Sequence, residues 1–262
     1  MNAAPLAGRH ALVTGAGGGI GAAIARALVQ AGAAVTLAGR REAPLREHVA
    51  RLAPARIFVA AGFDVTDPDA IARGLEAARA ALGPVDILVN NAGEAPSAPF
   101  ERTDPELWSR VIATNLTGVY YVTHAVLPDL KARGAGARIV NIASTAGLTG
   151  YDYVSAYCAA KHGVIGLTRA LAIELARTGV TVNAVCPGFT DTPLLDRVVE
   201  TIVVKTGRTE AKARANLASA NPQGRLVTPQ EVADSVLWLA SPGASAITGQ
   251  AIVVAGGEVM AG

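Results

Sequence analysis

A tyrosine and a lysine four residues apart, Tyr157 and Lys161, are the side chains in this sequence best suited to proton transfer. Side chains at this spacing lie on one face of a helix. A free tyrosine has a pKa of about 10 and shuttles protons poorly at neutral pH, but a neighbouring ammonium stabilises the phenolate. The pair therefore predicts acid–base chemistry, such as proton delivery to the alkoxide formed when a hydride reaches a ketone.

Two further polar residues could complete such a site. Ser144 ends an apolar run thirteen positions before Tyr157, and its hydroxyl could hydrogen-bond a substrate carbonyl. Asn115 is an unusual polar residue within a largely apolar helical stretch. Taken singly, each of the four residues has an equally good structural explanation. Their combined order and spacing favour a catalytic site.

A glycine cluster near the start of the chain predicts a nucleotide site. The segment reads Thr14-Gly15-Ala16-Gly17-Gly18-Gly19-Ile20-Gly21, between an apolar run and a helical pattern. Without a Cβ, the backbone N–H groups can approach a pyrophosphate, and the helix N-terminus adds unpaired donors and partial positive charge. A plain flexible turn would give the same letters, but the strand-to-helix context favours nucleotide binding.

The elements that must position these residues alternate regularly along the chain. Short runs without strict alternation, as expected for strands buried on both faces, cover His10–Thr14, Ala34–Ala38, Arg56–Ala60, Val85–Asn90, Arg138–Ala143, Val180–Val185 and Gln250–Val254. Helical patterns cover Ile20–Ala31, Pro44–Leu52, Asp67–Leu82, Asp104–Arg133, Ser155–Thr178 and Pro229–Leu239.

This alternation predicts an α/β fold, a single doubly wound (Rossmann) domain over residues 1–262. Right-handed crossovers make the sheet parallel and place helices on both of its faces. The segment 193–225 breaks the rhythm, with at most two helical pieces. Because it follows the sixth strand, it lies at the carboxyl edge of the sheet, and we expect it to be a substrate loop or lid.

The chain resembles the short-chain dehydrogenase/reductase family over nearly its whole length. Gly15, Gly19 and Gly21 match that family's T-G-x-x-x-G-x-G motif, Asn90 to Gly93 its N-N-A-G motif, and Tyr157 to Lys161 its Y-x-x-x-K motif. Asn115, Ser144 and Pro187-Gly188 also fall at the family's positions. The resemblance implies a seven-stranded sheet in the order 3-2-1-4-5-6-7 and hydride transfer between a nicotinamide cofactor and a carbonyl or alcohol.

The resemblance also implies roles for individual residues. Tyr157 is the general acid/base, Ser144 binds the oxyanion, Lys161 also binds the nicotinamide ribose, and Asn115 kinks its helix and holds a water in a proton relay. The implied cofactor contacts are Gly15, Gly17, Gly19, Ile20, Gly21, Arg40, Arg41, Asp64, Val65, Asn91, Ala92, Gly93, Tyr157, Lys161, Pro187, Gly188, Thr190 and Thr192.

Two arginines bear on which nicotinamide cofactor binds. The second strand runs into Gly39-Arg40-Arg41, without the carboxylate that would hold a ribose 2′-hydroxyl. Arg40 or Arg41 could form a charge-assisted bond to a 2′-phosphate. NADP(H) is therefore favoured and NAD(H) stays possible, because both arginines could also be simply solvated.

The substrate is less clearly indicated. The run from Ala176 to Pro193 resembles bacterial 3-oxoacyl thioester reductases and aromatic polyketide ketoreductases, but Glu94 to Ser97 lacks the Pro-Gly-Gly of the polyketide enzymes. Basic residues exceed acidic ones in 196–225, which suits a coenzyme A or acyl-carrier phosphopantetheine or is a solvated helix face. A 3-oxoacyl or 3-hydroxyacyl thioester is the first expectation, a simple ketone or secondary alcohol the second, and a non-catalytic nucleotide-binding regulator the alternative from another class.

The composition of the chain argues against several classes of binding partner. A net charge of +2 with scattered charges argues against nucleic acid, two cysteines and four dispersed histidines argue against disulfides and metal, and no apolar run reaches membrane-spanning length. No signal peptide is recognised, so a cytoplasmic protein is expected. By family analogy, the long helices Asp104–Arg133 and Ser155–Thr178 pair in a homotetramer.

Overall fold

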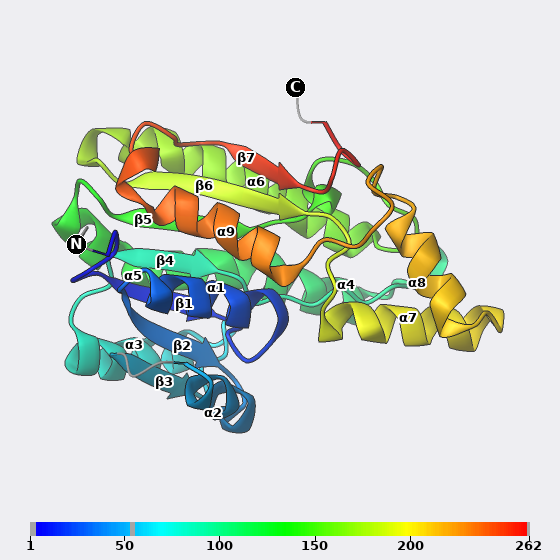
Figure 1. Ribbon diagram of the computed structural model, residues 1–262, viewed down its shortest axis with the longest axis horizontal. Coiled ribbons are helices and arrows are strands. Elements are labelled where there is room, and N and C mark those ends of the chain that lie inside the picture. The colour runs from blue at the N-terminus through cyan, green and yellow to red at the C-terminus, as the bar shows by residue number, and fades with distance from the viewer. Residues whose placement is uncertain (1–3, 53–55, 261–262) are drawn as a thin grey trace.

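The protein, described by a computed structural model over residues 4–52 and 56–260, is built on a seven-stranded parallel sheet (Figure 1). The strand order is β3-β2-β1-β4-β5-β6-β7, as predicted. The strands are β1 (His10–Thr14), β2 (Ala34–Gly39), β3 (Ile57–Ala61), β4 (Ile87–Asn90), β5 (Arg138–Ile142), β6 (Thr181–Pro187) and β7 (Ala251–Val254).

Helices cover both faces of this sheet (Figure 1). The helices are α1 (Gly19–Gln30), α2 (Glu42–Ala50), α3 (Pro68–Leu82), α4 (Pro105–Ile112), α5 (Gly118–Arg133), α6 (Ser155–Leu175), α7 (Pro193–Thr206), α8 (Glu210–Ala218) and α9 (Pro229–Ala240). Side chains from α1, α2 and α9 form the core on one face, and those from α3, α5 and α6 form the core on the other.

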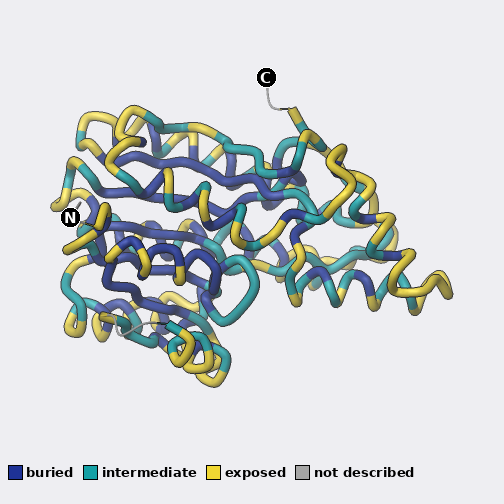
Figure 2. Tube along the Cα trace, viewed as in Figure 1, coloured by how far each residue is buried: buried dark blue, intermediate teal, exposed yellow. Residues whose placement is uncertain are grey.

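Strand β1 shows why the central strands are apolar throughout. Ala11 and Val13 pack into the core beneath α1 and α9, whereas Leu12 between them packs into the opposite core. Successive side chains of a strand point to opposite faces, so a strand covered on both sides buries every residue. All five β1 residues are buried, and the sheet forms the buried centre of the molecule (Figure 2).

The expected helix over Asp104–Arg133 is interrupted in the structure. Helix α4 ends at Ile112, a π-helical turn spans Ala113–Thr117, and α5 continues from Gly118. Periodicity alone does not reveal the extra residue in this turn, but the interruption lies at Asn115, where the family resemblance implies a kink. The wide turn carries Asn115, and such turns often occur at functional sites.

The segment 193–225 contains two helices, α7 and α8, which is the largest number that the sequence pattern allowed. Thr192 caps α7, its hydroxyl accepting a hydrogen bond from Leu195 N at 3.3 Å. Helices α7 and α8 share a small apolar cluster of their own and project beyond the carboxyl ends of the strands (Figure 1). No helix in the described ranges has the length and apolarity to cross a membrane.

Candidate active site

The predicted site residues gather where the carboxyl ends of β1, β4, β5 and β6 meet. Hydrogen bonds join the end of β1 to the segment after β4. The Thr14 hydroxyl accepts hydrogen bonds from Asn91 N at 2.9 Å and Ala92 N at 3.1 Å, and Asn91 Nδ2 donates to Thr14 O at 2.9 Å. The glycine turn and the N-N-A-G segment, 76 residues apart along the chain, therefore form one rigid wall.

Two glycines are required by the closeness of this wall. A Cβ on Gly15 would lie 2.8 Å from Ala92 Cα, and one on Gly21 would lie 2.4 Å from Gly15 O. Gly15 and Gly19 also have φ angles of +64° and +52°, which side chains disfavour. The turn is thus specified by packing and backbone conformation.

The start of α1 has the features of an anion cradle. Gly18 occupies the N-cap position without a side-chain cap, and the first turn carries no acidic residue. A Cβ at Gly18 would meet nothing within 4 Å, so the approach to the uncapped N–H groups is open. Uncapped donors with the helix dipole behind them fit a dinucleotide pyrophosphate. Half-buried Ile20 packs on the core below and fixes the helix.

The loop after β6 closes the other side of the cradle. Pro187 ends β6, and Thr190 is buried, its hydroxyl donating to Gly188 O at 2.9 Å. The methyl group of Thr192 lies 3.1 Å from the Cβ position of Gly19. The structure therefore brings the predicted contacts after β6 against the glycine turn, although the sequence separates them widely. Gly17 of that turn faces Pro44 of α2.

The predicted adenosine contacts lie at the ends of β2 and β3. Arg40 and Arg41 are exposed and form no ion pair within the described ranges. Burial alone would raise the pKa of Asp64, but hydrogen bonds from Thr66 and the charge of Arg40 lower it overall. Val65 is buried with its side chain against Gly118, so it can reach a ligand only through its backbone.

The predicted catalytic residues come together on α6 and at the end of β5. Ser144 lies close enough to Tyr157 to influence its pKa, and Lys161 Nζ lies 5.5 Å from the centre of the Tyr157 ring. Lys161 is only 3% exposed, and its Nζ donates to Ile142 O at 2.8 Å. Ser144 Oγ also accepts from Ala146 N at 3.1 Å, which fixes its direction.

Burial sets the pKa values of this pair. Desolvation raises the pKa of Tyr157 to about 12, although the nearby Ser144 hydroxyl opposes this rise. Desolvation also lowers the pKa of Lys161 to about 8. This differs from the expected lowering of the tyrosine pKa by the ammonium. Burial penalises the charged form of both groups and outweighs their mutual stabilisation.

Asn115 has a more specific role than its position in the sequence indicates. It is fully buried, and its Nδ2 donates to Glu94 O at 2.9 Å and to Val111 O at 3.0 Å. Its Oδ1 accepts from Glu94 N at 3.2 Å. The side chain thus clamps the segment after the N-N-A-G motif to the π-helical turn and positions the site wall.

Two residues that the sequence analysis did not select also reach this region. The Tyr151 hydroxyl donates to the Glu258 carboxylate and shares a 2.8 Å hydrogen bond with Thr145, next to Ser144. Glu258 Oε2 lies 2.5 Å from the Cβ position of Gly188. Burial and the Glu258 carboxylate raise the pKa of Tyr151 far above its usual value. Residues 107 positions apart carry no local signal of this contact.

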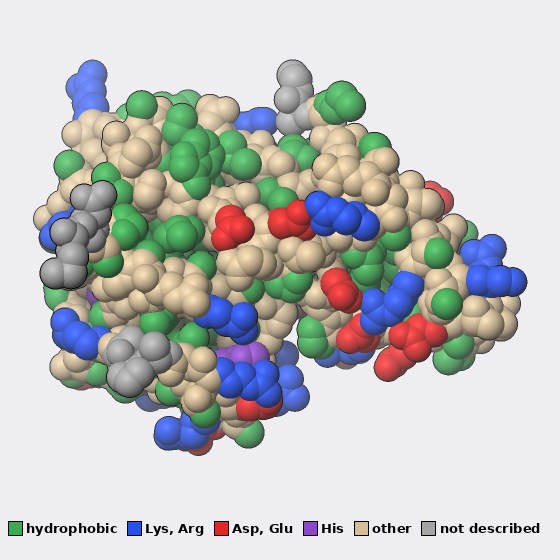
Figure 3. Space-filling model, in the orientation of Figure 1, with side chains coloured by type: hydrophobic (Ala, Val, Ile, Leu, Met, Phe, Trp, Pro, Cys, Tyr) green, Lys and Arg blue, Asp and Glu red, His purple; other side chains and the backbone are tan. Residues whose placement is uncertain are grey.

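The segment 193–225, predicted as a lid, has fewer unpaired charges than its composition indicates. The Arg214 guanidinium pairs with Asp191, Asp196 and Glu210, and Arg225 pairs with Glu231. Two of the basic residues that suggested an anionic substrate handle are therefore neutralised within the protein. Four remain without an ion pair in the described chain, namely Arg197, Lys205, Arg208 and Lys212. The surface is hollowed between α2 and the projecting α7–α8 (Figure 3).

A doubly wound sheet with a dinucleotide cradle and a Tyr–Ser–Lys cluster at its carboxyl edge defines a nicotinamide-type oxidoreductase. Comparison with known proteins agrees: residues 9–203 match the family model for short chain dehydrogenases. The chain belongs to the short-chain dehydrogenase/reductase family and is an oxidoreductase.

Its relatives include reductases and dehydrogenases. It is 43% identical to an acetoacetyl-CoA reductase of Rhizobium meliloti, over 97% of this chain and 99% of the relative. It is 39% identical to a D-beta-hydroxybutyrate dehydrogenase of Cupriavidus necator, over 97% and 99% of the two chains. A crystal structure of an actinorhodin polyketide ketoreductase variant with NADPH superposes with a TM-score of 0.91, at 43% identity over 95% and 97% of the chains.

Proposed function

We propose that this protein is an NADP(H)-dependent reductase that interconverts 3-oxoacyl and 3-hydroxyacyl thioesters, with Tyr157 as the general acid/base. The observation that carries this proposal is the cluster in which Lys161, held by Ile142 O, lies 5.5 Å from the Tyr157 ring centre, with Ser144 close to Tyr157. Two neighbouring hydroxyls can bind a carbonyl oxygen between them, and one of them can donate its proton to that oxygen.

In the reductive direction the cofactor, when bound, supplies the hydride that adds to the carbonyl carbon. Ser144 hydrogen-bonds the carbonyl oxygen as negative charge develops there. Tyr157 gives its proton to that oxygen, which completes the hydroxyl group and leaves a phenolate. The Lys161 ammonium stabilises the phenolate and binds the nicotinamide ribose. The wide turn around Asn115 holds the relay water that returns a proton.

The proposed cofactor preference rests on Arg40 and Arg41. Both side chains are exposed at the carboxyl edge and have no carboxylate partner in the described ranges, so a guanidinium can turn to a 2′-phosphate. The bound NADPH in the ketoreductase structure supports the same choice. The cradle contacts comprise the glycine turn, the N-N-A-G wall and the loop after β6.

The thioester assignment rests on charge near the substrate side of the site. The Glu258 carboxylate lies beside Gly188 and bonds Tyr151, so it disfavours a substrate whose own carboxylate would approach. A neutral thioester carbonyl is free of this repulsion. The name of the acetoacetyl-CoA reductase relative supports a thioester, whereas the hydroxybutyrate dehydrogenase relative is named for a free acid.

Segment 193–225 would cover the bound acyl chain, with its unpaired basic residues beside a coenzyme A or acyl-carrier phosphopantetheine. The second candidate substrate is a simple ketone or secondary alcohol, which needs neither Glu258 nor the basic residues. A single catalytic domain over 1–262, assembled as a homotetramer through α5 and α6, completes the proposal. A sizing column that shows only monomer would contradict the assembly.

The test follows NADPH oxidation with acetoacetyl-CoA and with ethyl acetoacetate, using the wild type and Tyr157→Phe. We expect turnover of the thioester, decreased by roughly 10²- to 10⁴-fold in the variant. Preference for the simple ester would favour the second candidate. Turnover that survives in Tyr157→Phe would exclude the proposed acid.

A further inference from the structure

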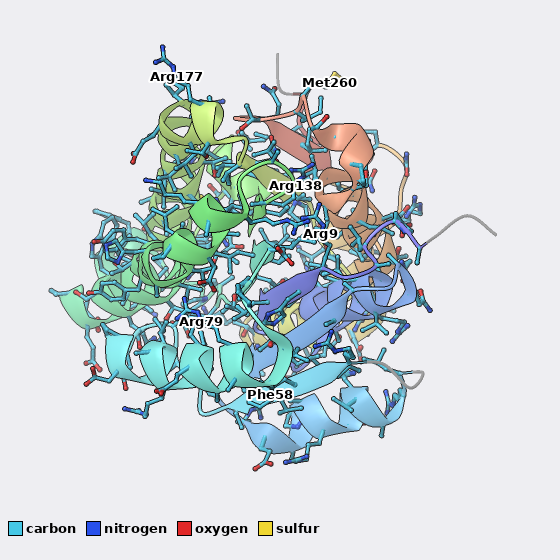
Figure 4. All side chains as sticks on the ribbon, turned by 90° about the vertical axis from the view of Figure 1, so that its left-hand side faces the viewer. Arg9, Phe58, Arg79, Arg138, Arg177 and Met260 are labelled. Atoms are coloured by element: carbon cyan, nitrogen blue, oxygen red, sulfur yellow. The ribbon has the colours of Figure 1, made fainter. Side chains whose placement is uncertain are left out.

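A second basic site lies at the amino edge of the sheet, at the opposite end of the strands from the active site. Arg9 precedes β1 and Arg138 begins β5, and both line a cavity of about 200 Å³ with Pro242 and Ser245. The two arginines lie close together at this edge (Figure 4). A Cβ on Gly136 would lie 2.4 Å from Arg9 Nη2, so the guanidinium lies directly against this glycine.

Both guanidinium groups keep unused donors. Arg138 is 3% exposed, its Nη1 donates to Ala137 O at 3.0 Å and its Nη2 to Ser241 O at 3.4 Å, but its buried Nε has no partner. The Nη1 of Arg9 is also buried without a partner. Among the described residues, neither arginine forms an ion pair with a carboxylate.

The nearest acidic group does not balance these charges. The Asp86 charge acts on Arg9, but its carboxylate accepts from His10 N at 2.9 Å and pairs with Arg133 at 3.4 Å. Burial lowers the pKa of both Arg9 and Arg138, and the charge of Arg9 lowers that of Arg138 further. Buried like charges are tolerated when a counter-ion and its hydrogen bonds compensate them.

We propose that Arg9 and Arg138 bind a small oxyanion, a phosphate or phosphoryl group, in this cavity. Guanidinium groups match the geometry of phosphate oxygens, and the unpartnered Nε and Nη1 supply donors for them. The cavity has room for several water molecules, which is enough for a phosphate group but too little for a nucleotide. The site is separate from the cofactor cradle and independent of the proposed reaction.

The experiment measures thermal unfolding of the full chain with saturating NADP⁺, so that the cofactor's phosphate contacts are filled. Inorganic phosphate at about 20 mM is compared with sodium chloride and sodium acetate of equal ionic strength. We expect phosphate to raise the unfolding midpoint by about 3–6 °C above both other salts. No rise, or an equal rise with chloride, overturns the site, and an equal rise with acetate overturns the phosphoryl assignment.

The matched variants are Arg9→Gln and Arg177→Gln, the latter at an exposed arginine remote from the cavity (Figure 4). Arg9→Gln should weaken the phosphate affinity measured by calorimetry at least tenfold and abolish the midpoint shift, while Arg177→Gln keeps both. Because Arg9 lies outside the active site, its variant should retain turnover. An undiminished phosphate response in Arg9→Gln would contradict the proposal whatever the enzyme's activity.

Discussion

The Lys161 ammonium lies 5.5 Å from the centre of the Tyr157 ring, yet it donates its hydrogen bond to the Ile142 carbonyl. The lysine is thus held one helical turn from the tyrosine and anchored to the end of β5. Burial lowers the pKa of Lys161 to about 8 and raises that of Tyr157 to about 12. A protonated lysine and a neutral tyrosine are therefore both present at neutral pH.

The pKa of Lys161 predicts a pH dependence of stability in the cofactor-free protein. The unfolded chain releases this proton near its ordinary pKa of 10.5 and the folded protein near 8, so the unfolded state binds more protons between these values. The free energy of unfolding should therefore rise with pH across this window, by about 3 kcal/mol in total. Urea unfolding between pH 7.5 and 9.5 checks this, with Lys161→Met lacking the rise; equal slopes in both proteins would refute it.

Two glycines three positions apart, Gly18 and Gly21, should respond differently to substitution by alanine. In Gly21→Ala the new Cβ would meet Gly15 O at 2.4 Å and Asn91 Nδ2 at 2.5 Å, so we expect a loss of about 1–3 kcal/mol in stability. Gly18→Ala meets nothing within 4 Å and should unfold like the wild type, but bind NADPH at least tenfold more weakly if Gly18 faces the pyrophosphate. Thermal unfolding and cofactor titration separate the two effects, and equal behaviour of the variants would contradict the cradle.

Removing the Asn115 amide should destabilise the whole site wall. Asn115→Ala leaves the N–H and C=O of Glu94 and the C=O of Val111 without their partner, at a cost of about 2–4 kcal/mol. A midpoint decrease of about 5–12 °C is expected, together with reduced kcat. The exposed Asn216→Ala is the control. A stable Asn115→Ala protein that has lost only turnover would instead point to a purely catalytic role.

The proposed contact between Arg40 and the 2′-phosphate predicts that an arginine variant will change KM for NADPH but not KM for NADH. Arg40→Ala should raise KM for NADPH by about 10- to 100-fold, because a charge-assisted hydrogen bond is lost, and leave KM for NADH nearly unchanged. Arg46→Ala, whose guanidinium pairs with Glu42, serves as the control on the adjacent helix. Equal losses for both cofactors, or none in either Arg40→Ala or Arg41→Ala, would rule out the 2′-phosphate contact.

Neutralising Glu258 should change which substrates are accepted. Glu258→Gln removes the negative charge beside Gly188, so kcat/KM for 3-hydroxybutyrate should increase about tenfold while that for acetoacetyl-CoA changes less than about threefold. Tyr151→Phe breaks the hydrogen bond but keeps the charge, and should not admit the free acid. The exposed Glu200→Gln on α7 is the charge control. An unchanged ratio in Glu258→Gln would remove the electrostatic basis for thioester selectivity.

Motif spacing indicated that Gly15 and Gly21 share one turn and that Tyr157 and Lys161 share one helix face, and the alternation of buried runs predicted the parallel sheet. These features are local, because a turn, one helix face and alternating runs depend on residues a few positions apart. The strand order and a kink at Asn115 came from the family resemblance. The bonds between Asn115 and Glu94, 21 residues away, have no local signal in the sequence.

Contacts between distant segments were decided only by the tertiary structure. Thr192 packs on Gly19, and Glu258 bonds Tyr151. Arg214, which the composition suggested for binding an anionic substrate, pairs with Asp191 instead. Arg9 lies near Arg138 at the amino edge of the sheet. Apart from the i,i+4 pair of Arg214 with Glu210, neighbouring residues in the chain do not indicate these partners. The physical reason is that the paths of the loops and the desolvation of the paired groups are set by global packing, which local residue patterns do not encode.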